Sequence, residues 1–164
     1  MQLVICLMGL QCSGIYLMEN YLVEAYGVKR YKGYTTRKRK KHEEGNTYNF
    51  LNVDQMIDED YALLAWRVYK GDFYARKLQD IPEGISVCVI DYNGYLELKD
   101  KVNTLPIYIN RGIKYRFKNC NSQWDIGYNE FLQRDFVDRV QFDLLVYDNE
   151  VIKINHEGIN NVFL

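Results

Sequence analysis

Two glycines, Gly9 and Gly14, are separated by four residues and stand between an apolar run and a helix-like segment. Phosphate-binding loops have this spacing, because their backbone amides and the following helix N-terminus attract anions. In a working loop a lysine and then a serine or threonine follow the second glycine and hold the outer phosphates and magnesium. Here Ile15 and Tyr16 occupy those positions, after Ser13 inside the loop. The spacing predicts an anion-attracting loop without its cation, although a tight strand-to-helix turn would need the same glycines.

Five consecutive basic residues, Arg37 to Lys41, form a second candidate site directly after Thr35 and Thr36. The formal net charge of the chain is −1, so this run is a local cluster and not part of a global positive field. The run indicates a site for a phosphate group, but it could also bind a nucleic-acid backbone or be a solvated loop. We favour the phosphate site and disfavour nucleic acid as a partner.

Composition limits the remaining function classes. The chain has 164 residues, 48% of them hydrophobic and 26% charged, which is typical of one globular domain. The four cysteines show no metal-finger spacing and neither histidine has a Cys or Asp partner at a ligand spacing, so we expect no metal site. Cys6 and Cys88 lie in apolar runs, which favours a reducing, cytoplasmic location. We expect neither a signal peptide nor a membrane span.

These candidate residues require strands and helices that position them. Apolar runs predict buried strands over Leu3–Met8, Ile85–Ile90 and Ile107–Ile109, with Pro106 just before the last. Helical spacing predicts one helix from about Leu17 that ends at Gly27, a second over Tyr92–Val102 and a third over Tyr128–Phe142. Leu63–Tyr74 is typical of a hairpin with a glycine turn, and short strands are expected over Leu144–Tyr147 and Val151–Ile154. This order predicts a parallel α/β sheet.

The segment from Thr35 to Phe50 resembles the monophosphate-binding stretch of the guanylate kinase family, which has Thr-Thr-Arg, a second Arg three residues later, then Glu, Gly and Tyr-x-Phe. Arg37 matches the first arginine, and Lys40 stands at the second, where the charge is kept but the bidentate fork is lost. With one residue deleted after Glu43, the remaining matches are Glu43, Gly45, Tyr48 and Phe50.

The resemblance continues to about residue 149. Leu63–Tyr74 is similar to the family hairpin, which places Tyr74 on a tyrosine that helps hold the monophosphate. Asp91, followed by Gly94, is similar to the acid at a strand end that lies near magnesium and both nucleotides, although it could also be a helix cap. Arginines that clamp ATP phosphates are expected from a lid; here Arg116, Arg134 and Arg139 fall in that region, or are solvated helix charges.

Three departures concern the base. The family reads guanine with a glutamate before the hairpin tryptophan, and Ala65 stands there. Small hydroxyl residues that contact guanine are replaced by Gly33 or Tyr34 and by Arg76. A further departure concerns the lid, where Cys120 stands at the position of an expected arginine. The resemblance therefore implies a retained phosphate grip with a lost guanine-reading set.

We predict one three-layer α/β domain of the P-loop type. It has a mainly parallel core (about 1–32 and 84–164), a strand-rich lobe for the monophosphate (33–82) and a lid (117–130). The resemblance implies phosphoryl transfer from ATP with Mg²⁺ to a GMP-type monophosphate. Because Ile15 and Tyr16 replace the loop lysine and hydroxyl, we expect this activity to be weak or absent. The alternatives are an inactive kinase-like module that binds a protein partner and a binder of phosphate backbones.

Overall fold

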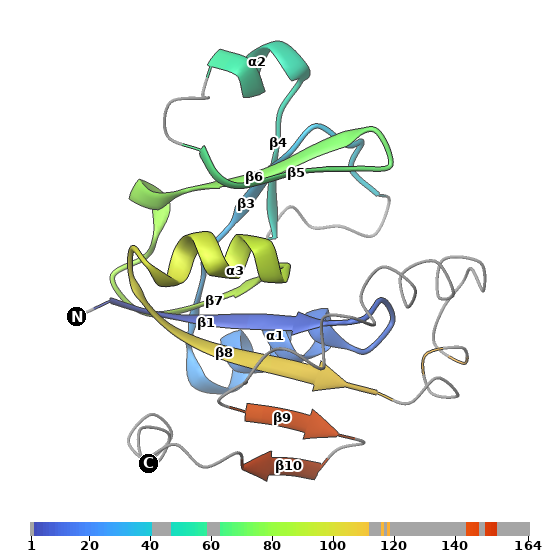
Figure 1. The fold of residues 1–164 in the computed structure, drawn as a ribbon, viewed down its shortest axis with the longest axis vertical. Helices are drawn as coiled ribbons and strands as arrows, with labels where there is room; N and C mark the ends of the chain where they lie inside the picture. The colour runs from blue at the N-terminus through green and yellow to red at the C-terminus, as the bar shows by residue number, and fades with distance from the viewer. Residues whose placement is uncertain are drawn as a thin grey trace.

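The computed structural model describes residues 2–40, 47–58, 63–111, 116, 118, 144–147 and 150–153, the last two ranges as backbone alone. Most of them form a six-stranded sheet with helices on both faces, and a four-stranded sheet lies beside it (Figure 1). The predicted three-layer α/β class with a mainly parallel sheet is confirmed.

The six-stranded sheet has the strand order β10-β9-β8-β1-β7-β2, and its only antiparallel pair among the described strands is β9 with β10. Its strands are β1 (Gln2–Gly9), β2 (Lys29–Arg30), β7 (Gly84–Val89), β8 (Asn103–Asn110), β9 (Leu144–Tyr147) and β10 (Glu150–Lys153). β1 lies between β7 and β8, and its centre is fully buried. A strand covered on both faces is apolar throughout, which explains why the sequence shows an unbroken apolar run there.

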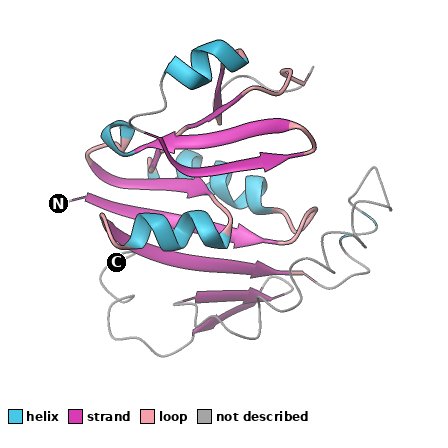
Figure 2. Cartoon of the chain, turned by 45° about the horizontal axis from the view of Figure 1, so that its top comes forward, coloured by secondary structure: helices cyan, strands magenta, loops and turns pink. Residues whose placement is uncertain are grey.

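Alternate residues of β1 contribute to two separate cores. Ile5 and Leu7 pack with residues of helix α1 (Ile15–Tyr26), whereas Val4 and Cys6 pack on the side of helix α3 (Tyr92–Lys99). The two helices therefore cover opposite faces of the large sheet (Figure 2). Gly27 ends α1 as predicted: its φ of 66° is the left-handed conformation that favours glycine at a helix C-terminus.

The chain leaves the large sheet after β2 and returns to it at β7, and the segment between forms what we call the small lobe, the described residues from 33 to 80. Its four strands have the order β4-β3-β6-β5 and lie above α3 in Figure 1. They are β3 (Gly33–Thr35), β4 (Tyr48–Phe50), β5 (Leu63–Tyr69) and β6 (Asp72–Lys77), with helix α2 (Val53–Asp58) after β4 and a 3₁₀ turn, η2 (Leu78–Asp80), after β6. β5 and β6 form the predicted hairpin.

Two sequence-based boundaries were wrong. α3 ends at Lys99 and not at Val102, because the Leu98 carbonyl accepts hydrogen bonds from both Lys101 and Val102 in a closing turn. β8 is longer than predicted and includes Pro106, which has no N–H for a strand ladder. Within the described residues, β9 pairs with β8 from Ile107 onward, and Pro106 is paired with Cys6 of β1 on the other side. Of the predicted lid, only Lys118 is among the described residues, and the helix over Tyr128–Phe142 lies outside them.

Candidate functional site

The turn between β1 and α1 is tightly wound. The Ser13 N–H donates to the Leu10 carbonyl at 3.1 Å, and Gly14 has a φ of 88°. A Cβ on Gly9 would lie 2.7 Å from the carbonyl oxygen of Ile109 and 2.9 Å from Ser13 Oγ, so only glycine fits at the end of β1. Ser13 is fully buried, and its hydroxyl has no hydrogen-bond partner among the described residues. The turn therefore packs closely against β8 and has Ser13 in its interior.

The N-terminus of α1 keeps the features that attract an anion but not those that hold a triphosphate. No side chain caps the helix at Gly14, and its first turn contains no acid. An uncapped helix N-terminus attracts negative charge through its free N–H groups. Ile15, at the position of the loop lysine, is partly buried and packs against the apolar cluster around Ile5 and Leu7. The loop lysine is therefore replaced by a core residue.

The small lobe brings three of the predicted monophosphate residues together. The guanidinium carbon of Arg37 lies 5.3 Å from the centre of the Tyr48 ring, which is within the range of a cation–π contact. The Tyr48 and Tyr74 rings meet edge to face with their centroids 5.9 Å apart. We call Arg37, Tyr48 and Tyr74 the aromatic cluster. It joins side chains of β4, β6 and the segment after β3.

Two threonines position Arg37. The Thr36 N–H donates to the Phe73 carbonyl at 3.1 Å, and the Phe73 N–H donates back to Thr36 Oγ1 at 2.9 Å. Thr35 is fully buried, and its hydroxyl accepts a hydrogen bond from the Arg37 N–H at 3.3 Å. These bonds fix the backbone of Arg37 beside β6, so the Thr-Thr-Arg order has a structural reason.

Tyr16 reaches the aromatic cluster from the other side. It lies in the first turn of α1, and its hydroxyl oxygen is 3.4 Å from that of Tyr48. Burial of the hydroxyl and the nearby Tyr48 raise the pKa of Tyr16 well above its ordinary value. Burial also raises the pKa of Tyr74, against the opposing charge of Arg37. Both phenols are therefore neutral at pH 7 and can donate hydrogen bonds to an anion.

The predicted monophosphate set has two further members, Lys40 and Glu43. Lys40 is described as an exposed residue of the basic loop, and Glu43 lies outside the described residues. Arg39, in the same loop, has its guanidinium carbon 5.8 Å from the centre of the Phe50 ring, which meets the Tyr48 ring edge to face.

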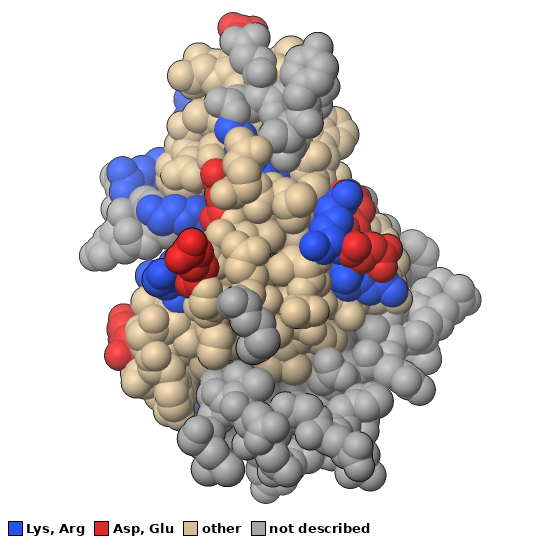
Figure 3. All heavy atoms as spheres, turned by 90° about the vertical axis from the view of Figure 1, so that its left-hand side faces the viewer, with Lys and Arg blue, Asp and Glu red and all other residues tan. Residues whose placement is uncertain are grey.

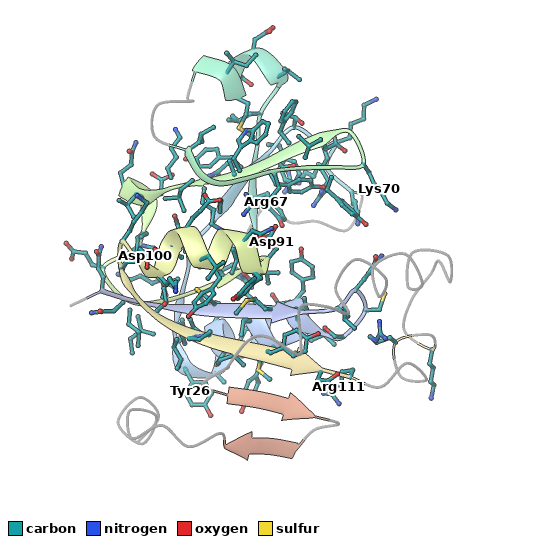
Figure 4. The ribbon with its side chains drawn as sticks, in the orientation of Figure 1. Tyr26, Arg67, Lys70, Asp91, Asp100 and Arg111 are labelled. Carbon is teal, nitrogen blue, oxygen red and sulfur yellow. The ribbon has the colours of Figure 1, made fainter. Side chains whose placement is uncertain are left out.

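Asp91 caps helix α3. One of its oxygens accepts the Gly94 N–H at 2.7 Å, and the other is 3.2 Å from Nε of Arg67. Figure 4 shows these two side chains facing each other between the hairpin and the start of α3. Arg67 also pairs with Glu97, whose other oxygen accepts the Ala65 N–H at 2.7 Å. The structure thus has the helix-cap arrangement that the sequence left as the alternative, and both Asp91 oxygens already have partners.

Two of the positions that the resemblance assigns to guanine contacts are residues 65 and 76, which are Ala65 and Arg76 here. Arg76 is buried and donates to the carbonyls of Tyr31 and Val89, the latter at 2.6 Å. Ala65 is buried with a φ of 54°, and a Cβ on Gly94 would lie only 2.9 Å from its methyl group. The buried face of the small lobe is therefore fixed to the core by Arg76 and presents no carboxylate at residue 65.

The predicted lid arginines are only partly described. Arg116 is buried, and its Nε donates to the Arg111 carbonyl at 3.1 Å. Arg134 and Arg139 lie outside the described residues. Of the three, only Arg116 is described, and its Nε is engaged by the backbone of Arg111.

Sequence reasoning missed one buried acid, Glu19. It lies three residues after Tyr16 on the same side of α1, and it is almost fully buried with Arg30 Nε 3.7 Å away. Burial raises the pKa of Glu19, while Arg30 and then Arg76 lower it. The available signal was its place between Ile15, Met18 and Leu22, which are the apolar positions of the helix.

The face of the molecule shown in Figure 3 has no large field of one sign among its described residues. On the face in Figure 3, Lys and Arg side chains lie in small groups beside Asp and Glu, separated by uncharged surface. Within the described part of the chain, no three His, Cys, Asp or Glu side chains gather as metal ligands would. None of the described helices is both long and apolar enough to cross a membrane.

Comparisons of the sequence and of the fold with known proteins both find guanylate kinases. No protein-family model matches the sequence. The chain is 27% identical over 146 residues to a guanylate kinase of Chlamydia caviae and 26% identical to that of Chlamydia abortus, in each case over 79% of this chain and 71% of the relative. The crystal structure of a guanylate kinase from Anaplasma phagocytophilum superposes with a TM-score of 0.69 at 16% identity, over 91% of this chain and 78% of that one. That similarity shows a shared fold.

Proposed function

Since its sequence and its fold both support membership of the guanylate kinase family, we propose that this chain is a nucleotide-binding protein that holds a nucleoside monophosphate in the aromatic cluster. The reaction implied by the family is phosphoryl transfer from ATP, and we propose that it is weak or absent here.

One observation carries the proposal. Arg37, Tyr48 and Tyr74 come from three separate segments of the sequence, and the Tyr48 ring lies within 6 Å of both the Arg37 guanidinium carbon and the Tyr74 ring. A guanidinium and neutral phenols together suit a phosphate monoester, because Arg supplies charge-assisted hydrogen bonds and the phenols donate without adding charge. Three residues that are distant in the sequence and had no common role would not be expected to share this ability to donate hydrogen bonds to a phosphate.

The residues present do not fit magnesium-bound ATP. Ile15 packs into the core where the loop lysine would be, and Tyr16 extends to the small lobe where a small hydroxyl would hold magnesium. Asp91 has both oxygens engaged, by the Gly94 amide and by Arg67. Phosphoryl transfer depends on positioning and on neutralisation of phosphate charge, so loss of these groups is expected to slow it severely.

Base recognition is the part of the family function with least support. The small lobe presents Ala65 and the internally bonded Arg76 where guanine would be read. A site without polar groups for the base edge discriminates poorly between bases. We therefore expect similar affinities for purine and pyrimidine monophosphates.

The test is calorimetry with the purified chain and each nucleoside 5′-monophosphate. Arg37→Ala removes hydrogen bonds to a charged group worth about 1.5–3 kcal/mol, which corresponds to a roughly 10- to 150-fold weaker affinity. Lys38→Ala is the matched control, because Lys38 is an exposed neighbour in the same basic loop. A coupled assay with ATP should show little or no turnover. Equal affinity of wild type and Arg37→Ala would contradict the site, and robust turnover would contradict the loss of activity.

A protein-binding role is a second candidate, and one observation favours it. Trp66 and Val68 lie on the same face of strand β5, and 44% and 54% of their surfaces are exposed. β5 is also one of the two edge strands of the small lobe. Exposed apolar side chains on an edge strand are typical of a surface that binds another chain. Pull-down of a partner that is lost in Trp66→Ser, with no monophosphate binding by wild type, would favour this candidate over the first.

A further inference from the structure

Tyr16 connects the two phosphate-related regions of the molecule. Its backbone belongs to the first turn of α1, directly after the glycine loop. Its hydroxyl ends beside Tyr48 in the small lobe, at 3.4 Å. The Tyr16 side chain therefore begins where a nucleoside triphosphate would be held and ends where a monophosphate would be held.

At its far end, Tyr16 has the surroundings of a phosphate ligand. Tyr48, its hydrogen-bond neighbour, lies under Arg37 and against the edge of Tyr74. Either of the Tyr16 and Tyr48 hydroxyls can be the donor in their mutual contact, so each can turn its proton toward an incoming oxygen. The Tyr16 residue is 49% exposed, so it is open to solvent while its hydroxyl faces the cluster. A phosphate group beside Arg37 would then meet three phenol hydroxyls, from Tyr16, Tyr48 and Tyr74.

The same position has a second consequence. In phosphoryl transfer the donor and acceptor oxygens lie roughly in line with the group that moves between them. A phenol that extends from the glycine loop to the acceptor cluster occupies this path. Small Ser or Thr side chains at residue 16 would leave it open.

We propose that Tyr16 is a ligand of the bound monophosphate and at the same time a barrier between the two phosphate positions. The site then accepts a single phosphate monoester and excludes a continuous chain of phosphates. This inference rests on the proposed function, because it assigns Tyr16 to the same monophosphate site. Under this inference Tyr16 contacts the bound monophosphate, which is the phosphate acceptor, and not a bound triphosphate.

Two variants of Tyr16 separate its two roles. The probes are GMP and a pentaphosphate that links guanosine to adenosine, which spans both phosphate positions. Tyr16→Phe removes the hydroxyl and keeps the ring, so it should weaken GMP binding about tenfold, as expected for one hydrogen bond to a charged group, and leave the pentaphosphate unchanged. Tyr16→Ala also removes the barrier, so it should weaken GMP by a similar factor and bind the pentaphosphate more tightly than wild type does.

The control is Tyr21→Phe, which makes the same chemical change on an exposed residue of the same helix and should change neither affinity. If Arg37→Ala loses GMP while Tyr16→Phe binds it as wild type does, the inference on Tyr16 is wrong and the proposed function stands. If Tyr16→Ala weakens both probes, Tyr16 is no barrier and the inference is again overturned. Wild-type protein that binds no monophosphate overturns both proposals.

Discussion

Replacement of Arg76 by Met should destabilise the chain by about 3 kcal/mol. The Arg76 guanidinium is buried, donates to the carbonyls of Tyr31 and Val89, and lies 5.0 Å from the centre of the Tyr31 ring. Two hydrogen bonds from a charged donor contribute about 3–6 kcal/mol together. Part of this is offset, because a buried methionine avoids the cost of removing a cation from water. A net loss of about 3 kcal/mol would be a large fraction of the roughly 5–15 kcal/mol that stabilises a typical domain.

The measurement is urea-induced unfolding followed by circular dichroism. Arg76→Lys should retain part of the stability, since an ammonium on a flexible chain cannot reproduce both bonds of the planar guanidinium. Arg67→Met is the matched control: Arg67 pairs with Asp91 and Glu97, whose side chains are 49% and 44% exposed, so its loss should cost less than about 1 kcal/mol. An Arg76→Met protein within 1 kcal/mol of wild type would refute the reasoning that Arg76 fastens the small lobe to the core.

Two further predictions concern α1 and α3. The raised pKa of Glu19 means that the folded state holds this proton more tightly than the unfolded chain does, so wild type should lose stability as pH rises from about 4.5 through the folded pKa. Glu19→Gln should lack that loss. Its unfolding free energy minus that of wild type, measured between pH 4 and 8, should therefore rise with pH. A difference that stays constant over this range would contradict the prediction. Gly94→Ala should destabilise the chain by about 1–3 kcal/mol through overpacking, because its Cβ would lie 2.9 Å from both the Ala65 methyl and Ile90 Cγ1. Thermal unfolding checks this, and an unchanged Tm would show that the helix can shift to make room.

The strands of the large sheet were predictable because their burial shows in the local sequence. β1 and β7 are buried on both faces, so each appears in the sequence as a continuous apolar run. α1 was predictable because Gly27 ends a helical pattern with the backbone conformation that favours glycine. Pro106 was misleading, since proline is typical of strand ends and edges, whereas here it lies inside β8.

The convergence of Arg37, Tyr48 and Tyr74 was predicted from an ordered set of motifs, and the structure brings those three residues together. Their role in binding stays a prediction. The contacts of Arg67 and Arg76 could not be predicted, because they depend on the register of β5 and β6 over α3 and the core. The direction of Tyr16 was also hidden, because a side chain at a helix start points to whichever element the tertiary fold places there.

The two ends of the small lobe lie close together. Tyr31, just before the lobe begins, donates its hydroxyl proton to the carbonyl of Lys77 at 2.9 Å, and its own carbonyl accepts from Arg76. An insertion whose entry and exit are tied in this way leaves the spacing of the flanking core strands unchanged, whatever lies between them. Evolution can therefore change the residues inside such an insertion, including the surface that selects a ligand, while the large sheet that carries it continues to fold in the same way.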